Sequence, residues 1–335
     1  RKTFILVHMK KIAINGFGRI GRVLFRILIK NPKYQIVAIN DIAHPKILSH
    51  LLKYDSIYGR GHYNISYTDD SIIFNNQKIF VSRKSKLKEL PWKKFDIDVV
   101  FECTGLFKTL SQNLTHIKSG AKKVILSSPP KDTDINMVVL GVNDYIINKS
   151  DKIISNASCT TNCAAPMIKV LDDFLGLESV YVTTVHSYTS DQNLHDGIHS
   201  DLRRARSAPN SIIPTTTGAA KALSHIFPNI EIGGCGIRVP VPSCSLTDIT
   251  CVMKNNADLK MVNQLFKDSS QNSLKNILYY STDPIVSVDV VSNPYSCVFD
   301  SQLTYAMGKM IKVVGWYDNE YGYCSRLVDL LSKIT

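Results

Sequence analysis

The chain has 335 residues, which at roughly 150 residues per domain is enough for about two domains with separate cores. Hydrophobic residues make up 44% and charged residues 20%, which excludes a disordered chain, a collagen-like fibre and a small disulfide scaffold. The net charge of +12 favours anionic partners such as phosphorylated metabolites or nucleic acid. The basic residues are scattered, however, as on an ordinary solvated lysine-rich surface. No apolar run approaches the roughly twenty residues of a membrane-spanning helix, so we expect no membrane segment.

Eight cysteines occur, none in a C-x-x-C pair, and their neighbours are mostly apolar. This pattern indicates buried free thiols in a reducing compartment, so we expect a cytoplasmic protein. No group of His, Cys, Asp and Glu has metal-ligand spacing, and we expect no metal site. Residues 1–8 carry an apolar core too short for a secretory signal, and we interpret them as a leader or translation remnant outside the fold.

A β-α-β unit is predicted near the start of the chain. Residues 11–15 predict a short buried strand, residues 20–28 carry an apolar stripe of helical spacing, and residues 35–40 predict a second strand. Between the first strand and the helix lies Gly16-Phe17-Gly18-Arg19-Ile20-Gly21, a G-x-G-x-x-G motif. A lone motif of this kind can be a structural turn, but its place between strand and helix favours dinucleotide binding.

Each part of this unit has a physical role in binding a dinucleotide. The glycines permit a tight turn, a close approach of the backbone to a pyrophosphate, and close packing of helix against strand. The pyrophosphate then meets the free N–H groups at the start of the helix. Asp41 lies twenty residues beyond Gly21, the spacing of a carboxylate that binds an adenosine ribose, although a surface turn would explain it too. A ribose-binding carboxylate repels a 2′-phosphate, which favours NAD over NADP.

Further strands are predicted at residues 79–81, 98–101, 123–126 and 136–140. Their alternation with helical segments implies an α/β domain with a mostly parallel sheet, which binds ligands at the carboxyl ends of its strands. Thr104-Gly105 and Ser127-Ser128-Pro129-Pro130 follow two of these strands. They are candidates for lining a cofactor cleft, and ordinary loop chemistry explains them equally well.

Cys159 differs from the other cysteines because Ser, Thr and Asn surround it. An apolar stripe of helical spacing runs from Met167 to Leu175, and Gly176 ends it. Since Pro166 is tolerated only near a helix start, we expect Cys159 at or just before a helix N-terminus. There the helix dipole and free N–H groups lower the pKa of a thiol and can hold an oxyanion. Cys159 is therefore a candidate nucleophile, with a packed structural thiol as the alternative.

A nucleophilic cysteine needs a nearby base. His186 follows a predicted strand at residues 180–185 and is the candidate, with a structural histidine as the alternative. A long polar loop follows, from residue 187 to about 211, and loops of this length in compact domains are usually functional. Its arginines Arg203, Arg204 and Arg206 are able to clamp phosphate.

Two later segments add anion-binding candidates. Thr215-Thr216-Thr217-Gly218 opens a helical stretch, whose N-terminus favours an anion. Arg238 follows a glycine-rich turn and precedes a rigid extended segment at residues 239–242. Ser, Thr and Arg around a thiol suggest a substrate that carries phosphate.

At this point the chain resembles the phosphorylating glyceraldehyde-3-phosphate dehydrogenases. The motifs run in family order from Met9 to the C-terminus, and the one centred on Cys159 is highly specific. They are Asn15-Gly16-Phe17-Gly18-Arg19-Ile20-Gly21-Arg22, Ala157-Ser158-Cys159-Thr160-Thr161-Asn162-Cys163, His186-Ser187-Tyr188-Thr189, Asp201-Leu202-Arg203-Arg204-Ala205-Arg206, Pro214-Thr215-Thr216-Thr217-Gly218-Ala219-Ala220-Lys221, Arg238-Val239-Pro240 and Trp316-Tyr317-Asp318-Asn319-Glu320.

The resemblance implies a fold of two domains. Residues 9–158 would form an NAD-binding Rossmann-type domain with a parallel sheet, joined by a C-terminal helix of about residues 321–335. Residues 159–320 would form an α+β catalytic domain with a mostly antiparallel sheet. The resemblance also implies a homotetramer whose long loop reaches toward a neighbouring subunit.

The resemblance implies a chemistry in which Cys159 is the nucleophile and His186 its base. D-Glyceraldehyde 3-phosphate would be oxidised with NAD⁺ and inorganic phosphate to 1,3-bisphosphoglycerate, through a thiohemiacetal and an acyl-thioester, in glycolysis or gluconeogenesis. The expected substrate- and phosphate-binding residues are Ser158, Thr160, Thr189, Arg204, Thr217, Gly218 and Arg238. The expected cofactor-binding residues, including the motif glycines, are Gly16, Gly18, Arg19, Ile20, Gly21, Asp41, Arg83, Thr104, Gly105, Ser127 and Asn319.

The chain departs from the family pattern in two places. The segment of residues 82–85 is longer than usual, and Arg83 is our choice for the adenine-side arginine. Gly197-Ile198 stand where many bacterial members carry Leu-Pro near the adenosine ribose, which weakens a strict preference for NAD.

Two alternative functions stay open at the level of sequence. An erythrose-4-phosphate dehydrogenase shares the scaffold and the Cys/His pair but hydrolyses its acyl-enzyme. A non-catalytic NAD- or RNA-binding protein belongs to another class, and it would not need Cys159, His186 and Arg238 together. The charge of +12 permits nucleic acid as a secondary partner, but no basic motif interleaved with aromatic residues supports it.

Overall fold

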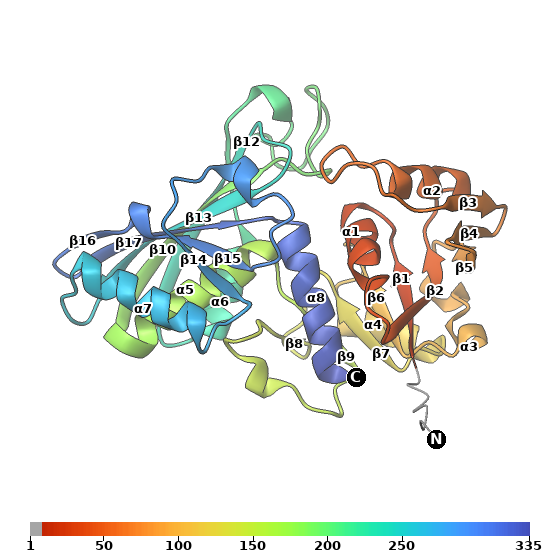
Figure 1. Ribbon diagram of the computed structural model, residues 1–335, viewed down its shortest axis with the longest axis horizontal. Coiled ribbons are helices and arrows are strands. Elements are labelled where there is room, and N and C mark those ends of the chain that lie inside the picture. Colours follow the sequence, from red (N-terminus) through yellow and green to blue (C-terminus); the bar gives the residue numbers. More distant parts are fainter. Residues whose placement is uncertain (1–8) are drawn as a thin grey trace, which may run out of the picture. The chain divides into compact units, whose positions relative to one another are not determined.

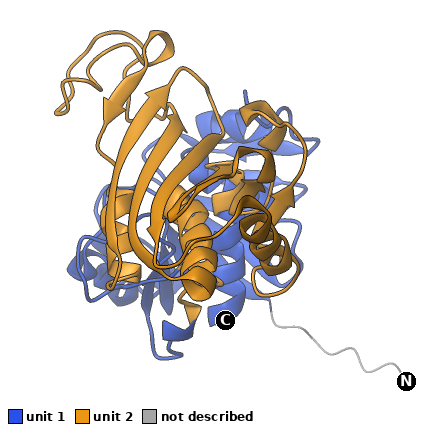
Figure 2. Ribbon diagram, turned by 90° about the vertical axis from the view of Figure 1, so that its left-hand side faces the viewer, with its two compact units in different colours: residues 1–138, 145–157, 324–335 blue, residues 139–144, 158–323 orange. Residues whose placement is uncertain are grey.

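The computed structural model describes residues 9–335, so the interpretation of residues 1–8 as a leader remnant lies outside the described residues. The chain divides into two compact units (Figures 1 and 2). Within the described part, unit 1 comprises residues 9–138, 145–157 and 324–335, and unit 2 comprises residues 139–144 and 158–323. The domain limits expected from sequence lie close to these, but residues 139–144 join unit 2 and the C-terminal return begins at residue 324. Among residues 9–335, no helix has the length and apolar character that crossing a bilayer demands.

Nine strands of the described residues form the sheet of unit 1, in the order β3-β4-β5-β2-β1-β6-β7-β9-β8. They are β1 (Lys10–Asn15), β2 (Tyr34–Asn40), β3 (Ile65–Thr68), β4 (Ser71–Phe74), β5 (Gln77–Ser82), β6 (Val99–Glu102), β7 (Lys123–Leu126), β8 (Asn136–Met137) and β9 (Ile153–Ser155). From β5 to β8 all neighbours are parallel, and β3 and β4 add an antiparallel edge. The predicted parallel α/β sheet is confirmed. Its strand order reverses at β1, so the crevice for a ligand lies between β1 and β6.

Helices cover this sheet. They are α1 (Arg19–Leu28), α2 (Pro45–Lys53), α3 (Trp92–Phe95), α4 (Leu110–Lys118) and the part of α8 (Tyr321–Ile334) from Cys324 onward, with the short 3₁₀ turns η1 (Leu87–Glu89) and η2 (Asp144–Ile146) between elements. The apolar stripe of α1 faces the core through Val23, Leu24 and Leu28. The C-terminal helix belongs to the same unit, and its Ser332 hydroxyl lies 3.0 Å from the hydroxyl of Tyr34.

The strand predicted at residues 136–140 is too long. Only Asn136 and Met137 pair as β8, and the N–H of Val138 still donates to the carbonyl of Ser155 at 2.8 Å. The Asn143 side chain then accepts the N–H of Val139 at 2.7 Å, within a turn in which the N–H of Asn143 donates to the carbonyl of Val139 at 3.1 Å. The apolar residues at these positions are buried in a turn, and the sequence pattern does not distinguish a buried turn from a strand.

The sheet of unit 2 has eight strands among the described residues, in the order β11-β12-β10-β13-β17-β15-β14, with β16 paired to β17. The strands are β10 (Leu177–Ser187), β11 (Ile213–Thr215), β12 (Glu231–Val239), β13 (Ser245–Met253), β14 (Leu278–Ser281), β15 (Cys297–Asp300), β16 (Tyr305–Met307) and β17 (Met310–Tyr317). Only the pairs β10–β12 and β14–β15 are parallel, so the expected mostly antiparallel sheet is confirmed.

The glycine-rich segment before Arg238 is a strand, and the prediction of a turn there is wrong. Gly233, Gly234 and Gly236 all lie within β12. A Cβ added to Gly234 would lie 2.6 Å from the carbonyl oxygen of Val182 on β10, so the glycine permits a close approach of the two strands. The parallel register of β10 and β12 places Arg238 beside His186.

The helices of unit 2 are α5 (Cys159–Leu175), α6 (Gly218–Ile226) and α7 (Leu259–Gln271), with 3₁₀ turns η3 (Ala208–Asn210), η4 (Ser287–Val290) and η5 (Ser301–Leu303). Cys159 is the first residue of α5, as predicted, and Gly176 ends the helix with a φ of 71°. Pro166 is the eighth residue of the helix, so the prediction that this proline lies near the helix start is wrong. The Ser158 side chain, which accepts the N–H of Thr161 at 3.1 Å, defines the start instead.

Candidate active site

The glycine-rich turn of unit 1 is shaped by close backbone contacts. Gly16 has a φ of +90°, and a Cβ there would lie 2.7 Å from the backbone nitrogen of Thr104. A Cβ on Gly21 would lie 2.2 Å from the carbonyl oxygen of Gly16. Gly18, by contrast, is exposed and faces open space. The turn therefore packs tightly on its inner side and leaves room for a ligand on its outer side.

The N-terminus of α1 fits a pyrophosphate. No side chain caps it, and no acidic residue lies in its first turn, so its N–H groups and dipole are available to an anion. Arg19 stands at this point, paired with Asp55 at 2.8 Å, with its guanidinium 5.6 Å from the ring centre of Tyr58. Burial tends to raise the pKa of Asp55, but the N–H groups of Tyr58 and Ile57 and the Arg19 guanidinium outweigh it and lower that pKa.

The carboxylate of Asp41 lies beside the same turn. It accepts the N–H of Phe17 at 2.8 Å and the N–H of Ala43 at 3.0 Å. The backbone N–H of Asp41 donates to the carbonyl of Ser82 at 3.1 Å, and exposed Arg83 directly follows Ser82. Ile20 is half-buried in the first turn of α1. The residues predicted for the adenosine side thus lie at one edge of the sheet.

The segments after β6 and β7 meet at that edge too. Thr104 donates its N–H to the Glu102 carboxylate at 2.8 Å, and its hydroxyl also hydrogen-bonds to this carboxylate. The Ser127 hydroxyl donates to the carbonyl of Glu102 at 2.9 Å. Gly105, with a φ of +71°, has open space around its Cα. Glu102, which no sequence pattern singled out, holds both segments in place.

In unit 2, Cys159 and His186 meet as predicted. The Sγ atom of Cys159 lies 3.6 Å from Nε2 of His186, which is buried near the end of β10. Tyr317 of β17 packs its ring edge against the imidazole, with ring centres 6.1 Å apart. The Tyr317 hydroxyl lies 2.8 Å from the Thr160 hydroxyl and 3.0 Å from that of Thr184. Tyr317 thus ties α5, β10 and β17 together around the pair, a role that its sequence motif did not reveal.

The other ring nitrogen of His186 has two neighbours. Arg238 Nη1 lies 2.7 Å from Nδ1, and the carbonyl oxygen of Ser187 also lies 2.7 Å from it. A guanidinium only donates and a carbonyl only accepts, so these two contacts favour opposite tautomers of the ring, and Arg238 Nη1 also donates to the Ser187 carbonyl at 2.8 Å. Burial and the positive charge of Arg238 lower the pKa of His186 to about 3. His186 is therefore neutral at physiological pH.

Burial also raises the pKa of the Cys159 thiol. The charge of Arg238 and the backbone N–H groups of Thr160 and Cys159 act in the opposite direction but do not outweigh burial. The prediction that the helix N-terminus gives this thiol a lowered pKa is therefore wrong for this arrangement. The physical reason is desolvation, which disfavours a thiolate.

The buried neutral His186 predicts a pH-dependent stability. Its pKa of about 3 lies below the ordinary value of 6.5, so between these values the unfolded chain binds more protons. Stability is full above pH 6.5 and falls as the pH is lowered, by about 1.4 kcal/mol per pH unit from this group. Urea unfolding at pH 6.5 and pH 5.0 should show the wild-type protein losing about 2 kcal/mol more than His186→Asn. Equal losses in the two proteins would contradict a buried neutral imidazole.

Of the three loop arginines, only Arg204 is held in a half-buried position by several neighbouring residues. Its side chain is mostly buried, pairs with Asp191 at 2.7 Å, and donates to the Thr215 hydroxyl at 3.0 Å and the Thr216 carbonyl at 3.2 Å. Arg203 is exposed, and Arg206 pairs with Asp196 on the surface. Arg204 lies near enough to Arg238 to lower the pKa of Arg238, after burial, which is the larger cause. The structure thus gathers Cys159, His186, Arg238 and Arg204.

The remaining predicted residues surround this cluster or lie close to it in the chain. Thr217 caps α6 by accepting the N–H of Ala219 at 3.2 Å, and exposed Gly218 has open space beside it. Thr189 lies half-buried at the start of the long loop. The Asn319 carbonyl accepts hydroxyls of Ser187 at 3.0 Å and Ser245 at 3.2 Å, which orients its amide nitrogen outward from that pair.

The sequence did not indicate Asp191 as a site residue, because acidic residues in loops usually face solvent. Its role appears only in the ion pair with Arg204 and in a second contact, 3.5 Å from Nε2 of His199. Burial tends to raise the pKa of Asp191, but Arg204 and His199 outweigh it and lower that pKa.

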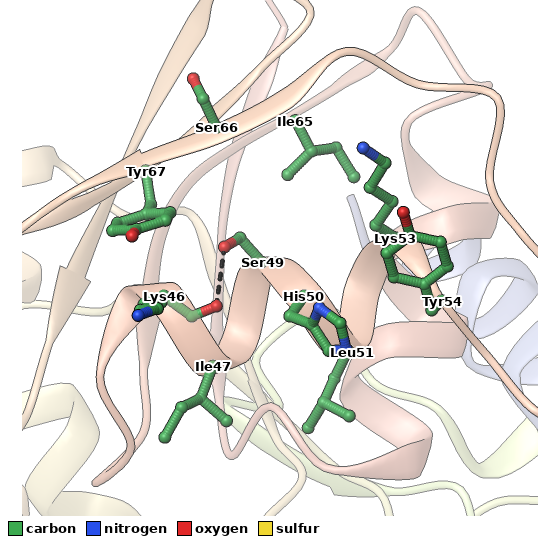
Figure 3. Close-up of a pocket in the computed structure, with 10 residues that line it drawn as sticks. All are labelled: Lys46, Ile47, Ser49, His50, Leu51, Lys53, Tyr54, Ile65, Ser66 and Tyr67. Carbon is green, nitrogen blue, oxygen red and sulfur yellow. Dashed lines mark hydrogen bonds between the residues drawn. The ribbon is translucent and has the colours of Figure 1, made fainter.

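Within residues 9–335, no group of three or more His, Cys, Asp and Glu side chains is placed to hold a metal ion. A surface hollow of about 670 Å³ in unit 1 lies between α2 and β3 (Figure 3). Its lining includes exposed Ile47, Tyr54 and Tyr67, and none of the predicted site residues.

Comparisons with known proteins agree with this geometry. Residues 10–110 match the family model described as the NAD binding domain of glyceraldehyde 3-phosphate dehydrogenase, and residues 158–319 match its C-terminal domain. Glyceraldehyde-3-phosphate dehydrogenase 2 of Bacillus subtilis (strain 168) is 47% identical, covering 97% of this chain and 96% of the relative. The chain belongs to the glyceraldehyde-3-phosphate dehydrogenase family.

Two mycobacterial members give the same result. The glyceraldehyde-3-phosphate dehydrogenase of Mycobacterium avium is 48% identical, over 97% of this chain and 98% of the relative. That of Mycobacterium leprae (strain TN) is 46% identical, with the same coverage of both chains. The chain is therefore an NAD-dependent oxidoreductase of this family, as its motifs predicted, with NAD as the cofactor of unit 1. The turn around Gly16, the uncapped helix α1 and the Asp41 carboxylate fit that cofactor.

Proposed function

We propose that this protein oxidises D-glyceraldehyde 3-phosphate with NAD⁺ and inorganic phosphate to 1,3-bisphosphoglycerate. The observation that carries the proposal is the row of contacts from the Cys159 sulfur through His186 to Arg238, at 3.6 and 2.7 Å. A nucleophile, a base and a half-buried guanidinium that can bind an anion, in contact with one another, suit an aldehyde that carries a phosphate. The bound nicotinamide supplies the hydride acceptor.

His186 acts as the base only when Nε2 is free of its proton. The Ser187 carbonyl, 2.7 Å from Nδ1, accepts an Nδ1 proton in the alternative tautomer. Arg238 Nη1, also 2.7 Å from Nδ1, acts against the Ser187 carbonyl and favours the tautomer with its proton on Nε2. A substrate phosphate that draws Arg238 away, assisted by Thr189, would restore the competent one. His186 then takes the thiol proton as Cys159 attacks the aldehyde carbon, giving a thiohemiacetal and, after hydride loss, an acyl-thioester.

The start of α5 suits the charge that develops at the reacting carbon. The backbone N–H groups of Cys159 and Thr160 act on the sulfur and favour negative charge there. The Ser158 side chain caps the helix, and the Thr160 hydroxyl contacts Tyr317 and also acts on the Cys159 sulfur. Helix N–H groups so placed can stabilise the oxyanion of the thiohemiacetal.

Arg204, Thr217 and Gly218 are our candidates for binding the attacking phosphate. Arg204 is held by Asp191 and Thr215, and the N-terminus of α6 carries the open Gly218. Phosphate attack on the thioester would release an acyl phosphate and restore the Cys159 thiol. Phosphate bound beside the thioester favours this outcome over hydrolysis, which would waste the energy of oxidation.

Asn319 would contact the nicotinamide amide, and Arg83 the adenine side, as expected from the resemblance. We also propose a homotetramer in the cytoplasm, in agreement with the family and with cysteines that are all free. Nucleic acid would be at most a secondary partner.

The reaction is tested by NADH formation at 340 nm with NAD⁺ and either glyceraldehyde 3-phosphate or erythrose 4-phosphate, each with and without phosphate. We expect fast turnover of the triose that requires phosphate or arsenate. Faster turnover of the tetrose without phosphate would favour an erythrose-4-phosphate dehydrogenase. NAD binding without turnover of either sugar would leave a non-catalytic binding protein.

A further inference from the structure

A row of buried hydroxyl groups leads away from the Cys159 sulfur in unit 2. The Thr160 hydroxyl acts on that sulfur and lies 2.8 Å from the hydroxyl of Tyr317. The Tyr317 hydroxyl lies 3.0 Å from that of Thr184, which reaches the carbonyl oxygen of Leu246 at 3.4 Å. All three hydroxyl-bearing residues are buried, and Tyr317 is 1% exposed. The row therefore joins the start of α5 to β17, β10 and β13 behind the nucleophile.

The hydroxyls of this row can be arranged in two ways, because each one donates one hydrogen bond and accepts others. In the first arrangement every hydroxyl donates away from the sulfur, and the last proton, on Thr184, goes to the Leu246 carbonyl. In the second arrangement every hydroxyl donates toward the sulfur, and Thr160 gives its hydrogen bond to the sulfur. A thiol is compatible with the first arrangement. A thiolate only accepts, so it favours the second.

Tyr317 is suited to link the two ends of the row. Burial raises the pKa of Tyr317, and the charge of a Cys159 thiolate acts in the same direction. The phenol therefore keeps its proton near and above neutral pH, and it can serve only as a hydrogen-bond donor and acceptor. Inside a buried site a hydrogen bond that leads to a charged group is stronger than one between neutral groups.

The charged and titratable groups around the sulfur come from several elements. Burial raises the pKa of Cys159, and the cationic Arg238 on β12 opposes this effect. His186 on β10 is neutral, and Cys163, one turn along α5, faces Tyr317. Arg238 thus contributes a fixed charge, whereas the row of hydroxyls contributes dipoles that can turn with the ionisation of the sulfur.

We propose that Tyr317 is a positioning residue for the nucleophile, which acts through the Thr160 hydroxyl to stabilise the ionised sulfur of Cys159. As the thiol proton passes to His186, the row turns from the first arrangement to the second. No proton travels along the row, since each oxygen keeps its own proton and changes only the partner to which it donates. The inference rests on Cys159 as the proposed nucleophile and not on the identity of the aldehyde.

Tyr317→Phe tests this role, because it removes the hydroxyl and keeps the ring that packs against His186. Alkylation of Cys159 by iodoacetamide is followed against pH in the full-length protein without cofactor or substrate, with the labelled peptide quantified by mass spectrometry. We expect the midpoint to rise by about half a pH unit, which makes alkylation about threefold slower below the midpoint. An unchanged midpoint would overturn the proposal. Triose turnover of the wild type, measured separately, tests the proposed function, and the alkylation does not depend on it.

The path through Thr160 is tested in a second background. Thr160→Val removes the hydroxyl that acts on the sulfur, and the midpoint should rise by about one pH unit. Thr160→Ser keeps the hydroxyl and should restore the wild-type midpoint. Adding Tyr317→Phe to Thr160→Val should have no further effect, because the tyrosine acts through that hydroxyl. An equal effect of Tyr317→Phe in both backgrounds would assign it to packing and contradict the proposal.

Thr247 on β13 provides a matched control. It pairs with Thr184 in the ladder of β10 and β13, and its hydroxyl is buried without a hydrogen-bond partner among residues 9–335. Thr247→Val should therefore show the wild-type midpoint. A shift as large as that of Tyr317→Phe would mean that the loss of any buried hydroxyl has this effect, and the proposal would be wrong.

Thr184→Val keeps the test available if Tyr317→Phe does not fold. It removes the hydroxyl that donates to Tyr317 in the second arrangement. The midpoint should rise in the wild-type background and stay unchanged when Thr184→Val is added to Thr160→Val. A midpoint that does not move in the wild-type background would count against the row of hydroxyls as a whole.

Discussion

Replacing Cys159 with serine is expected to lower turnover of the triose by about 10⁴-fold or more while leaving NAD⁺ affinity unchanged. A serine hydroxyl in the same place is far less acidic than a thiol, and its neutral neighbour His186 is a weak base with a pKa of about 3. An oxygen ester would also replace the thioester that phosphate attacks in the proposed mechanism. The measurement is steady-state NADH formation, with NAD⁺ binding followed separately.

Cys163 offers a matched control one helical turn further along α5. It is fully buried, and its thiol donates to the carbonyl of Gly315 at 3.6 Å. A serine there keeps a donor for that carbonyl, so Cys163→Ser should retain turnover close to wild type. If the two variants lost activity equally, the loss would reflect a damaged helix α5 and Cys159 would not be the nucleophile.

Replacing His186 with asparagine is the second change with a large expected effect, a fall in kcat of about 10²- to 10⁴-fold. Burial raises the pKa of the Cys159 thiol, so without a base little thiolate forms near neutral pH. The variant should regain activity as the pH rises, whereas the wild type should not need high pH. Alkylation of Cys159 by iodoacetamide, followed against pH, gives a second readout of the same group.

The exposed His225 on α6 provides the control for this variant. His225→Asn should show wild-type kcat and a wild-type alkylation profile. An alkylation profile unchanged in His186→Asn would show that another group activates the thiol.

The sequence correctly predicted those parts of the fold that are determined by residues close together in the chain. The glycine motif, its flanking strand and helix, and the cysteine at the start of α5 depend on residues close together in the chain. The contact of Cys159 with His186 could not be predicted from neighbouring residues in the same way, because it joins helix α5 to β10, an interior strand of the sheet. The end of a predicted strand made His186 a candidate base, but local sequence left a structural histidine as an equal alternative, and the resemblance to a family favoured the pair.

The predictions that failed concern burial and the register of strands that are far apart in the chain. The glycines before Arg238 read as a turn, yet they permit β12 to lie against β10, far away in sequence. The acidity of Cys159 was misjudged because a helix N-terminus is visible in sequence and desolvation is not. Glu102 and His116 looked like ordinary residues of a strand and a helix, since nothing local shows that they meet in the core.

The side-by-side register of His186 and Arg238 also bears on how the chain can vary in length. Neighbouring positions on parallel strands share a face of the sheet, and a shift of one residue turns a side chain to the opposite face. An insertion or deletion inside β10 or β12 would therefore separate the base from the anion-binding arginine in one step. Length changes can be absorbed in connecting loops that carry no site residue, such as residues 240–244. In this protein the sheet sets the spacing of the base and the arginine, whereas the loop of residues 188–212 is constrained by the contacts of Arg204 with Asp191 and Thr215.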